Sequence, residues 1–130
     1  MLLDTTFLID LMRGDEGAVE KATEIEAQLR QQRVSSMTLF ELYYGVARSN
    51  QPEQERSIVE EVLTTKPIQP ADTAVMRKGG RIAGELANAG EPIGDGDVII
   101  AATASVLDEP VVTRNSADFD RIDEIDVETY

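Results

Sequence analysis

Short runs of β-forming residues alternate with longer helical stretches along the whole chain, and this alternation constrains the fold more than any other feature. It is typical of a parallel sheet covered by helices, because parallel neighbours must be joined by long crossover connections. Ile68 lies between two prolines, so a strand there must be short and near an edge. Strands are predicted at Met1–Thr5, Val34–Ser36, around Ile68, at Pro110–Thr113 and at Ile125–Val127. We therefore expect an α/β fold with a mainly parallel central sheet.

Apolar residues at helical spacing predict six helices between and after these strands. The stretch Val98–Leu107 is nearly all apolar or small, which predicts a helix buried on every side. No repeat or interdomain linker interrupts the pattern, so residues 1–130 are predicted to form a single domain. The other helices are marked by Phe7, Leu8, Leu11 and Met12, by Ala18, Ala22, Ile25 and Leu29, by a stripe from Thr38, by Ile58, Val59, Val62 and Leu63, and by Val75, Ile82, Ala83 and Leu86.

The absence of two residue types, Cys and His, limits the catalytic mechanisms that the chain could use. The chain contains no Cys and no His, which excludes disulfides, thiolate nucleophiles and imidazole catalysis. An enzyme of this composition must therefore work through Asp, Glu, Lys, Tyr, Ser, Thr or a bound cofactor. Oxygen ligands favour hard cations such as Mg²⁺ or Mn²⁺.

The charge is strongly negative. Asp and Glu total 25 against 12 Lys and Arg, giving a formal net charge of −13, and only three of the basic residues are lysines. Such a surface suits concentrated salt, where like charges are screened, so we expect a halophilic protein; an acidic protein of an ordinary cell is the alternative. The charge also argues against extended nucleic-acid binding, so any nucleic-acid site should be a local cleft.

The sequence also bears on localisation. No apolar run approaches the roughly 20 residues needed to cross a bilayer. Met1-Leu2-Leu3 is followed at once by Asp4, which does not resemble a signal peptide. We expect a cytoplasmic protein with no membrane association.

Several polar residues fall where strands end or helices begin. Asp4 ends the first predicted strand, Arg114-Asn115 follows a late strand, Asp97 opens a helix and Glu41 lies in the first turn of another. Ligands bind outside the carboxyl ends of strands in sheets of this kind, so the fold would bring these residues to one edge. Carboxylates gathered there would repel one another unless a cation neutralised them. A Mg²⁺ ion held by one or two carboxylates, water and phosphate would do so.

Each acidic residue also has a purely structural interpretation. Asp4, Asp95 or Asp97 could be a helix N-cap. Thr38-Leu39-Phe40-Glu41 fits a capping box, in which Glu41 folds back onto the N-cap amide. Asp118 could form an Asx-type turn after Asn115. These interpretations explain each residue alone but not their convergence.

The order of the motifs resembles the PIN domain of the VapC toxin family over essentially the whole chain. The resemblance implies a three-layer α/β/α fold, a ribonuclease dependent on Mg²⁺ or Mn²⁺, dimerisation, and neutralisation by a cognate antitoxin protein. It is carried by Leu3-Asp4-Thr5-Thr6, by Thr38-Leu39-Phe40-Glu41-Leu42 with Gly45, by Pro92-Ile93-Gly94-Asp95-Gly96-Asp97-Val98-Ile99-Ile100-Ala101-Ala102-Thr103-Ala104, and by Val112-Thr113-Arg114-Asn115 with Asp118-Phe119.

The resemblance assigns Asp4, Glu41 and Asp97 to the family's acidic positions, with Asp4 and Asp97 as direct metal ligands. The fourth catalytic position departs from the pattern, because Asn115 stands where some family members carry Asp, and Asp118 is the candidate to replace it. Possible additional members of the site are Thr6, Asn115 and Asp95, the last as a competitor of Asp97. Arg114 is expected to contact a phosphate.

Other interpretations remain open at this level. The chain could be a PIN-type nuclease that acts on DNA flaps or in RNA processing, a phosphatase on a doubly wound sheet, or a catalytically inactive interaction module. Asp4-Thr5-Thr6 lacks the second acidic residue of an aspartyl-phosphate phosphatase. Four arginines could line an RNA path or simply be solvated: Arg13, Arg48, Arg77 and Arg81.

Overall fold

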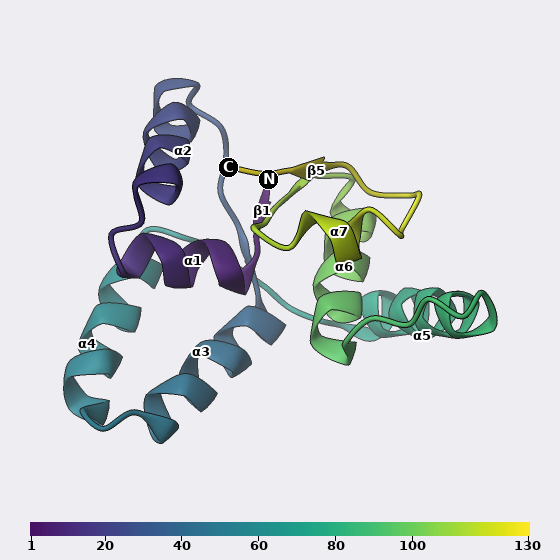
Figure 1. The fold of residues 1–130 in the computed structure, drawn as a ribbon, viewed down its shortest axis with the longest axis horizontal. Coiled ribbons are helices and arrows are strands. Elements are labelled where there is room, and N and C mark those ends of the chain that lie inside the picture. The colour runs from purple at the N-terminus through teal and green to yellow at the C-terminus, as the bar shows by residue number, and fades with distance from the viewer.

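The computed structural model describes all 130 residues as short parallel strands covered by helices (Figure 1). The strands are β1 (Leu2–Leu3), β2 (Val34–Ser35), β3 (Ile68–Gln69), β4 (Val111–Val112) and β5 (Val127–Glu128). The helices are α1 (Thr5–Met12), α2 (Glu16–Ala27), α3 (Ser36–Arg48), α4 (Pro52–Leu63), α5 (Thr73–Asn88), α6 (Asp95–Leu107) and α7 (Ser116–Phe119).

All strand pairs are parallel. β1, β4 and β5 pair in that order, β2 pairs with β3, and a parallel bridge between Leu2 and Arg33 joins the two groups. The spatial order is therefore β3-β2-β1-β4-β5, with Ile68 on the edge strand as predicted. The chain leaves β1 toward β2 on one side and returns to β4 on the other, so strand order reverses at β1. A ligand site is expected beside the carboxyl end of β1.

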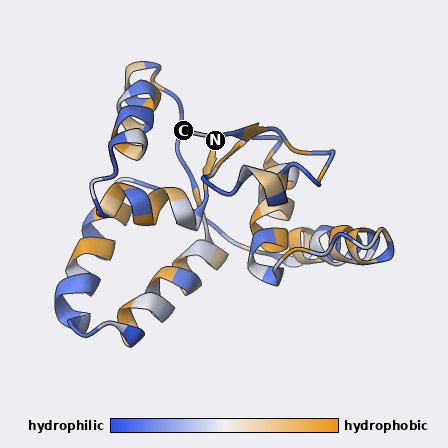
Figure 2. Ribbon diagram, in the orientation of Figure 1, coloured by the Kyte–Doolittle hydropathy of each residue, from blue (hydrophilic) through white to orange (hydrophobic).

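The two faces of the sheet are covered by different helices. Leu2 and Val111 belong to one buried cluster, with residues of α5, α6 and α7. Leu3 and Val112 belong to a second cluster, with residues of α1, α2, α3 and α4. Successive residues of a strand point to opposite faces, so this division makes three layers, α/β/α. In Figure 2 the central strands are mostly hydrophobic and the outer helices carry both hydrophilic and hydrophobic residues. The predicted fold class is confirmed.

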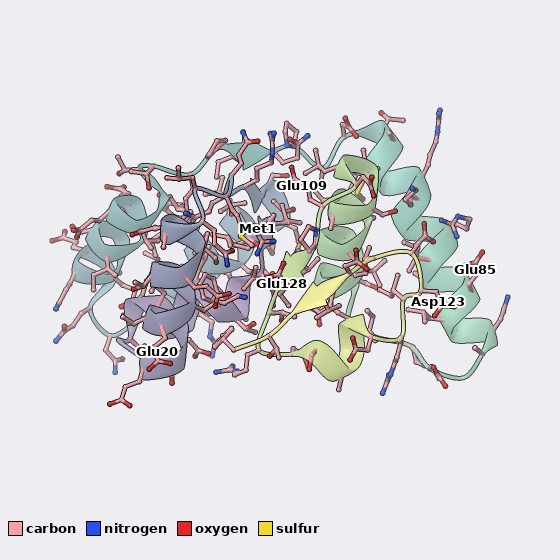
Figure 3. The ribbon with its side chains drawn as sticks, turned by 90° about the horizontal axis from the view of Figure 1, so that it is seen from above. Met1, Glu20, Glu85, Glu109, Asp123 and Glu128 are labelled. Carbon is pink, nitrogen blue, oxygen red and sulfur yellow. The ribbon has the colours of Figure 1, made fainter.

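The start of the chain is fixed beside the sheet by an ion pair and a hydrogen bond. The Met1 amino group lies 3.0 Å from Glu109 Oε2 and donates to the Gln31 carbonyl at 2.8 Å. In Figure 3, Met1, Glu109 and Glu128 lie near the middle of the molecule, whereas Glu20 and Glu85 lie toward its two ends.

None of the helices combines the length and apolar character that a bilayer-spanning segment requires.

The capping box predicted for Thr38 and Glu41 is wrong. Helix α3 begins at Ser36, and its N-cap is Ser35, whose hydroxyl accepts a hydrogen bond from the Met37 amide at 3.0 Å. Thr38 is therefore a fully buried residue inside the helix, and Glu41 lies in its second turn. The Thr-x-x-Glu pattern also fits residues inside the helix, and here it lies three residues after the true N-cap.

Other boundaries differ by a few residues. The first strand ends at Leu3, because Thr5 already begins α1. Helix α6 begins at Asp95 instead of Asp97, and the last strand is Val127–Glu128 instead of Ile125–Val127. Helix α6 is buried from Ile100 to Ala104, but Val106 in its last turn is 41% exposed, so it is not covered on every side.

Candidate active site

The carboxylate of Asp4 is the buried centre of the site. Asp4 stands at the N-cap position of α1, yet its side chain makes no capping hydrogen bond and is 1% exposed. Its Oδ2 accepts from the Thr6 hydroxyl at 2.7 Å and the Thr113 hydroxyl at 2.8 Å. Its Oδ1 is buried without any hydrogen-bond partner. A buried, unpaired carboxylate oxygen is costly unless something else bonds to it, so the N-cap interpretation does not explain this residue.

Glu41 faces the same region from α3. Its Oε1 accepts from the Thr5 hydroxyl at 2.8 Å, and Thr5 Oγ1 also lies 3.0 Å from Thr38 Oγ1. On the other side, a Cβ atom added to Gly96 would lie 3.1 Å from Glu41 Oε2. The first turn of α6 can therefore approach this carboxylate because residue 96 has no side chain.

Asn115 joins the remaining two acidic residues. Its side-chain amide donates to Asp97 Oδ2 at 3.3 Å and to Asp118 Oδ2 at 2.9 Å. Its own backbone N–H donates to the Thr113 hydroxyl at 2.9 Å, the same hydroxyl that holds Asp4. The loop after β4 thus ties Asp4, Asp97 and Asp118 to one another through a neutral residue.

The carboxylates perturb one another electrostatically. Burial and, after it, the negative charges of Asp4, Glu41 and Asp118 together raise the pKa of Asp97 from 3.8 to about 6, while the hydrogen bond from Asn115 opposes the change. Burial also raises the pKa of Glu41, with the Thr5 hydrogen bond opposing and the charge of Asp4 adding to it. The predicted convergence of the four acidic residues is therefore visible in their mutual influence.

The donor set is compatible with a hard divalent cation. No three acidic side chains lie close enough together to enclose a metal by themselves. Mg²⁺ does not require such a cage, because it retains waters and binds through one or two carboxylates plus substrate oxygens. The unpaired Asp4 Oδ1 and the like-charged Asp97 provide the ligand type and the negative charge that such an ion prefers.

Two predicted residues lie differently from expectation. Asp95 is exposed in the first turn of α6, and its side chain forms no hydrogen bond or ion pair with the residues of the site. Arg114 is 59% exposed, and its NH1 donates to Asp10 Oδ1 at 2.7 Å. Asp10 also accepts from the Tyr130 hydroxyl at 2.7 Å, and the Tyr130 ring packs edge-on against Phe7.

The sequence reasoning missed several supporting residues. Thr5 and Thr113 donate to the Glu41 and Asp4 carboxylates, Asp10 accepts from Arg114, and Tyr130 donates to Asp10. Thr5 and Thr113 lie directly beside assigned motif residues, so adjacency was an available signal. No local pattern links Tyr130 to Asp10, which are 120 residues apart.

Together, the three-layer parallel sheet and the acidic cluster at the reversal of strand order define a nuclease-type α/β domain. Residues 1–125 match the PIN domain family. The chain is 30% identical over 121 residues to the tRNA(fMet)-specific endonuclease VapC of Shigella flexneri, covering 93% of this chain and 90% of the relative. The structure of VapBC2 from Rickettsia felis bound to a promoter DNA fragment matches with a TM-score of 0.90 at 27% identity, covering 99% of this chain and 97% of that one. DNA-bound VapBC from Salmonella typhimurium matches with a TM-score of 0.88 at 33% identity, covering 98% and 96%.

The chain therefore belongs to the PIN-domain family. More narrowly, it is an endoribonuclease of the VapC type, the toxin component of a type II toxin–antitoxin system. The family, fold class and enzyme class predicted from the sequence are confirmed.

Proposed function

We propose that this chain cleaves RNA with a Mg²⁺ or Mn²⁺ ion held by Asp4 and Asp97, and that Glu41 and Asp118 complete the catalytic set. The observation that carries the proposal is the Asp4 carboxylate, which has one oxygen fixed by two threonine hydroxyls and the other buried without a partner. The two threonine hydrogen bonds fix the orientation of the Asp4 carboxylate. They leave its Oδ1 free to bind a ligand from outside the chain, such as a metal ion.

Each side chain has a distinct part in this proposal. When bound, the metal would lower the pKa of a water molecule and stabilise charge on the phosphate. Asp4 is fixed by Thr6 and Thr113, so it contributes a ligand that needs no reorientation. Glu41, whose pKa is raised by burial, is suited to accept a proton from the attacking water. Asn115 orients Asp97 and Asp118, which places it in a supporting role.

Arg114 remains the proposed phosphate contact. Asp10 engages only the NH1 atom, and the rest of the exposed guanidinium stays available for a bidentate interaction. Its backbone N–H lies 3.2 Å from the Thr6 hydroxyl, so the residue is tied to the Asp4 support.

The partners follow from the relatives. We propose that this chain, folded as a single domain over residues 1–130, acts on initiator tRNA, because two relatives, at 30% and 37% identity, are described as tRNA(fMet)-specific. We also propose a cognate antitoxin, since the matching structures include toxin–antitoxin complexes. A homodimer is proposed as well, supported by large apolar side chains left exposed on α3 and α5, namely Phe40, Tyr44 and Met76.

Cleavage of initiator tRNA and of total RNA tests the proposal. Activity should require Mg²⁺ or Mn²⁺, disappear in EDTA, and fall by orders of magnitude in Asp4→Asn while the fold is kept. Asp95→Asn is the matched control, because Asp95 is acidic and adjacent but makes no contact in the site. Full activity in EDTA, or near-normal cleavage by Asp4→Asn, would contradict the proposed mechanism.

A further inference from the structure

The hydroxyl of Thr38 has no role in capping α3, and it does not bond to its own helix either. Its side chain is fully buried in the interior of the helix. A threonine in such a position commonly donates to the carbonyl four residues before it. Thr103 of α6, which is equally buried, does so with the Ile99 carbonyl at 2.7 Å. The Thr38 hydroxyl instead points across to α1, where its only hydrogen-bond partner is the Thr5 hydroxyl at 3.0 Å.

The sheet brings Thr5 and Thr38 together, although they lie 33 positions apart in the sequence. β1 and β2 are parallel neighbours, bridged at Leu2 and Arg33, and α1 and α3 begin at the same edge, so their first turns lie side by side (Figure 1). Glu41 follows Thr38 by three positions and therefore lies on the same face of α3. Thr5 thus stands opposite both residues.

The number of protons on these three side chains sets the direction of the hydrogen bonds. Thr5 Oγ1 lies 2.8 Å from Glu41 Oε1 and 3.0 Å from Thr38 Oγ1, and its geometry suits donation to either. A hydroxyl has one proton and two acceptor lone pairs, whereas an ionised carboxylate can only accept. The Thr5 proton therefore goes to Glu41, the charged and nearer acceptor, and the Thr38 proton completes the other contact. The result is a directed chain from Thr38 through Thr5 to Glu41.

We propose that Thr38 is a positioning residue, whose hydroxyl turns the Thr5 hydroxyl toward Glu41 and thereby fixes the Glu41 carboxylate in the active site. Thr5 is the only hydrogen-bond donor to Glu41, which is half-buried and has a long side chain. Without the Thr38 hydroxyl, that of Thr5 is free to rotate, and Glu41 loses its fixed orientation. This inference rests on the proposed catalytic role of Glu41.

Kinetics of matched variants separate the hydroxyl of residue 38 from its shape. Thr38→Val keeps the shape of the side chain and removes the hydroxyl, whereas Thr38→Ser keeps the hydroxyl and removes a methyl group. With an initiator tRNA transcript in Mn²⁺, Thr38→Val should lower kcat roughly fivefold with KM unchanged, which is the effect of one neutral hydrogen bond. Thr38→Ser should keep most of the wild-type kcat even though the missing methyl group lowers its Tm.

Thr103→Val is the matched control. It removes an equally buried hydroxyl, which bonds within α6 and contacts no residue of the site. Its kcat should equal that of the wild type, whatever its Tm.

A double-variant cycle without metal tests the link to Glu41 independently of catalysis. In EDTA, Thr38→Val should lower Tm by about 4 °C, but by only about 2 °C when Glu41→Gln is also present. The difference is expected because each hydrogen bond is stronger in a chain that ends on a charge, and Gln removes that charge.

The outcomes separate this inference from the proposed function. Equal losses of Tm in the two backgrounds, or a wild-type kcat in Thr38→Val, would overturn the role of Thr38. A Thr38→Ser protein that loses as much kcat as Thr38→Val would assign the effect to packing and overturn it too. If the cycle shows the coupling but the wild type cleaves no RNA in Mn²⁺, Thr38 positions Glu41 as inferred and the proposed catalysis fails.

Discussion

Replacing Asp97 with Asn should stabilise the protein in metal-free buffer, although Asp97 is a proposed catalytic residue. Burial and three neighbouring carboxylates raise the pKa of Asp97 from 3.8 to about 6 in the folded protein. An acid whose pKa is raised by folding binds its proton more tightly in the native state. Its ionisation therefore lowers the free energy of unfolding as pH rises from about 3.8 to about 6. At neutral pH the full penalty is present, and Asn removes it.

The magnitude follows from that pKa difference. Each pKa unit corresponds to about 1.4 kcal/mol, so the upper limit of the penalty is about 3 kcal/mol. Asp97 is only partly buried, and solvent screening reduces the figure to about 1.5 kcal/mol. Loss of a negative charge in the first turn of α6 costs about 0.5 kcal/mol. The net gain is about 1 kcal/mol, which for a chain of 130 residues raises Tm by about 4 °C.

Thermal unfolding in EDTA at constant ionic strength measures this effect. Asp97→Asn should melt about 4 °C above the wild type at about pH 7.5, and the difference should nearly vanish at about pH 4. Addition of about 10 mM MgCl₂ should raise the Tm of the wild type more than that of the variant, because the variant lacks a proposed metal ligand. Asp95→Asn is the control and should not gain stability. A variant that melts below the wild type in EDTA at about pH 7.5 would refute the electrostatic argument.

Three further predictions concern the site and the surface. Glu41→Gln should abolish most cleavage while stability is kept or raised, because Gln keeps the Thr5 hydrogen bond and loses the charge. As a control, Ser35→Ala removes the observed cap of α3 and should lower the free energy of unfolding by about 0.5–2 kcal/mol, measured in denaturant. An active Glu41→Gln protein would return Glu41 to a structural role. Tyr130→Phe leaves one oxygen of buried Asp10 without its donor, so it should cost about 1–3 kcal/mol and weaken substrate binding through Arg114, measured as a higher KM. An unchanged KM would show that Tyr130 does not affect substrate binding. Finally, molar KCl should raise Tm, because the charge of −13 is screened; a flat or falling Tm would remove the halophilic interpretation.

The sequence predicted the fold well because its signals are local. Helical and β-type periodicities are set by neighbouring side chains, so all five strands and the six longer helices were predicted close to their observed positions. The short helix α7 was not predicted, since four residues are too few to show periodicity. Exact boundaries were less accurate, as at α3, where the cap is Ser35 and Thr38 is buried against Thr5.

The sequence by itself predicted which residues approach the site. Asp4, Asp97, Asn115 and Asp118 lie just after a strand or near the start of a helix, and parallel topology brings such positions to one edge. Glu41 lies one turn further into α3 than predicted. Only the tertiary structure decided how they interact. It showed that Asp4 keeps one buried oxygen free, that Asp95 is exposed without a side-chain hydrogen bond, and that Arg114 is held by Asp10, which Tyr130 also contacts. It also separated the free Arg13 and Arg48 from Arg81, which Glu85 and Glu124 neutralise. Hydrogen-bond partners and ion pairs depend on side chains that are remote in the sequence, and no local periodicity encodes them.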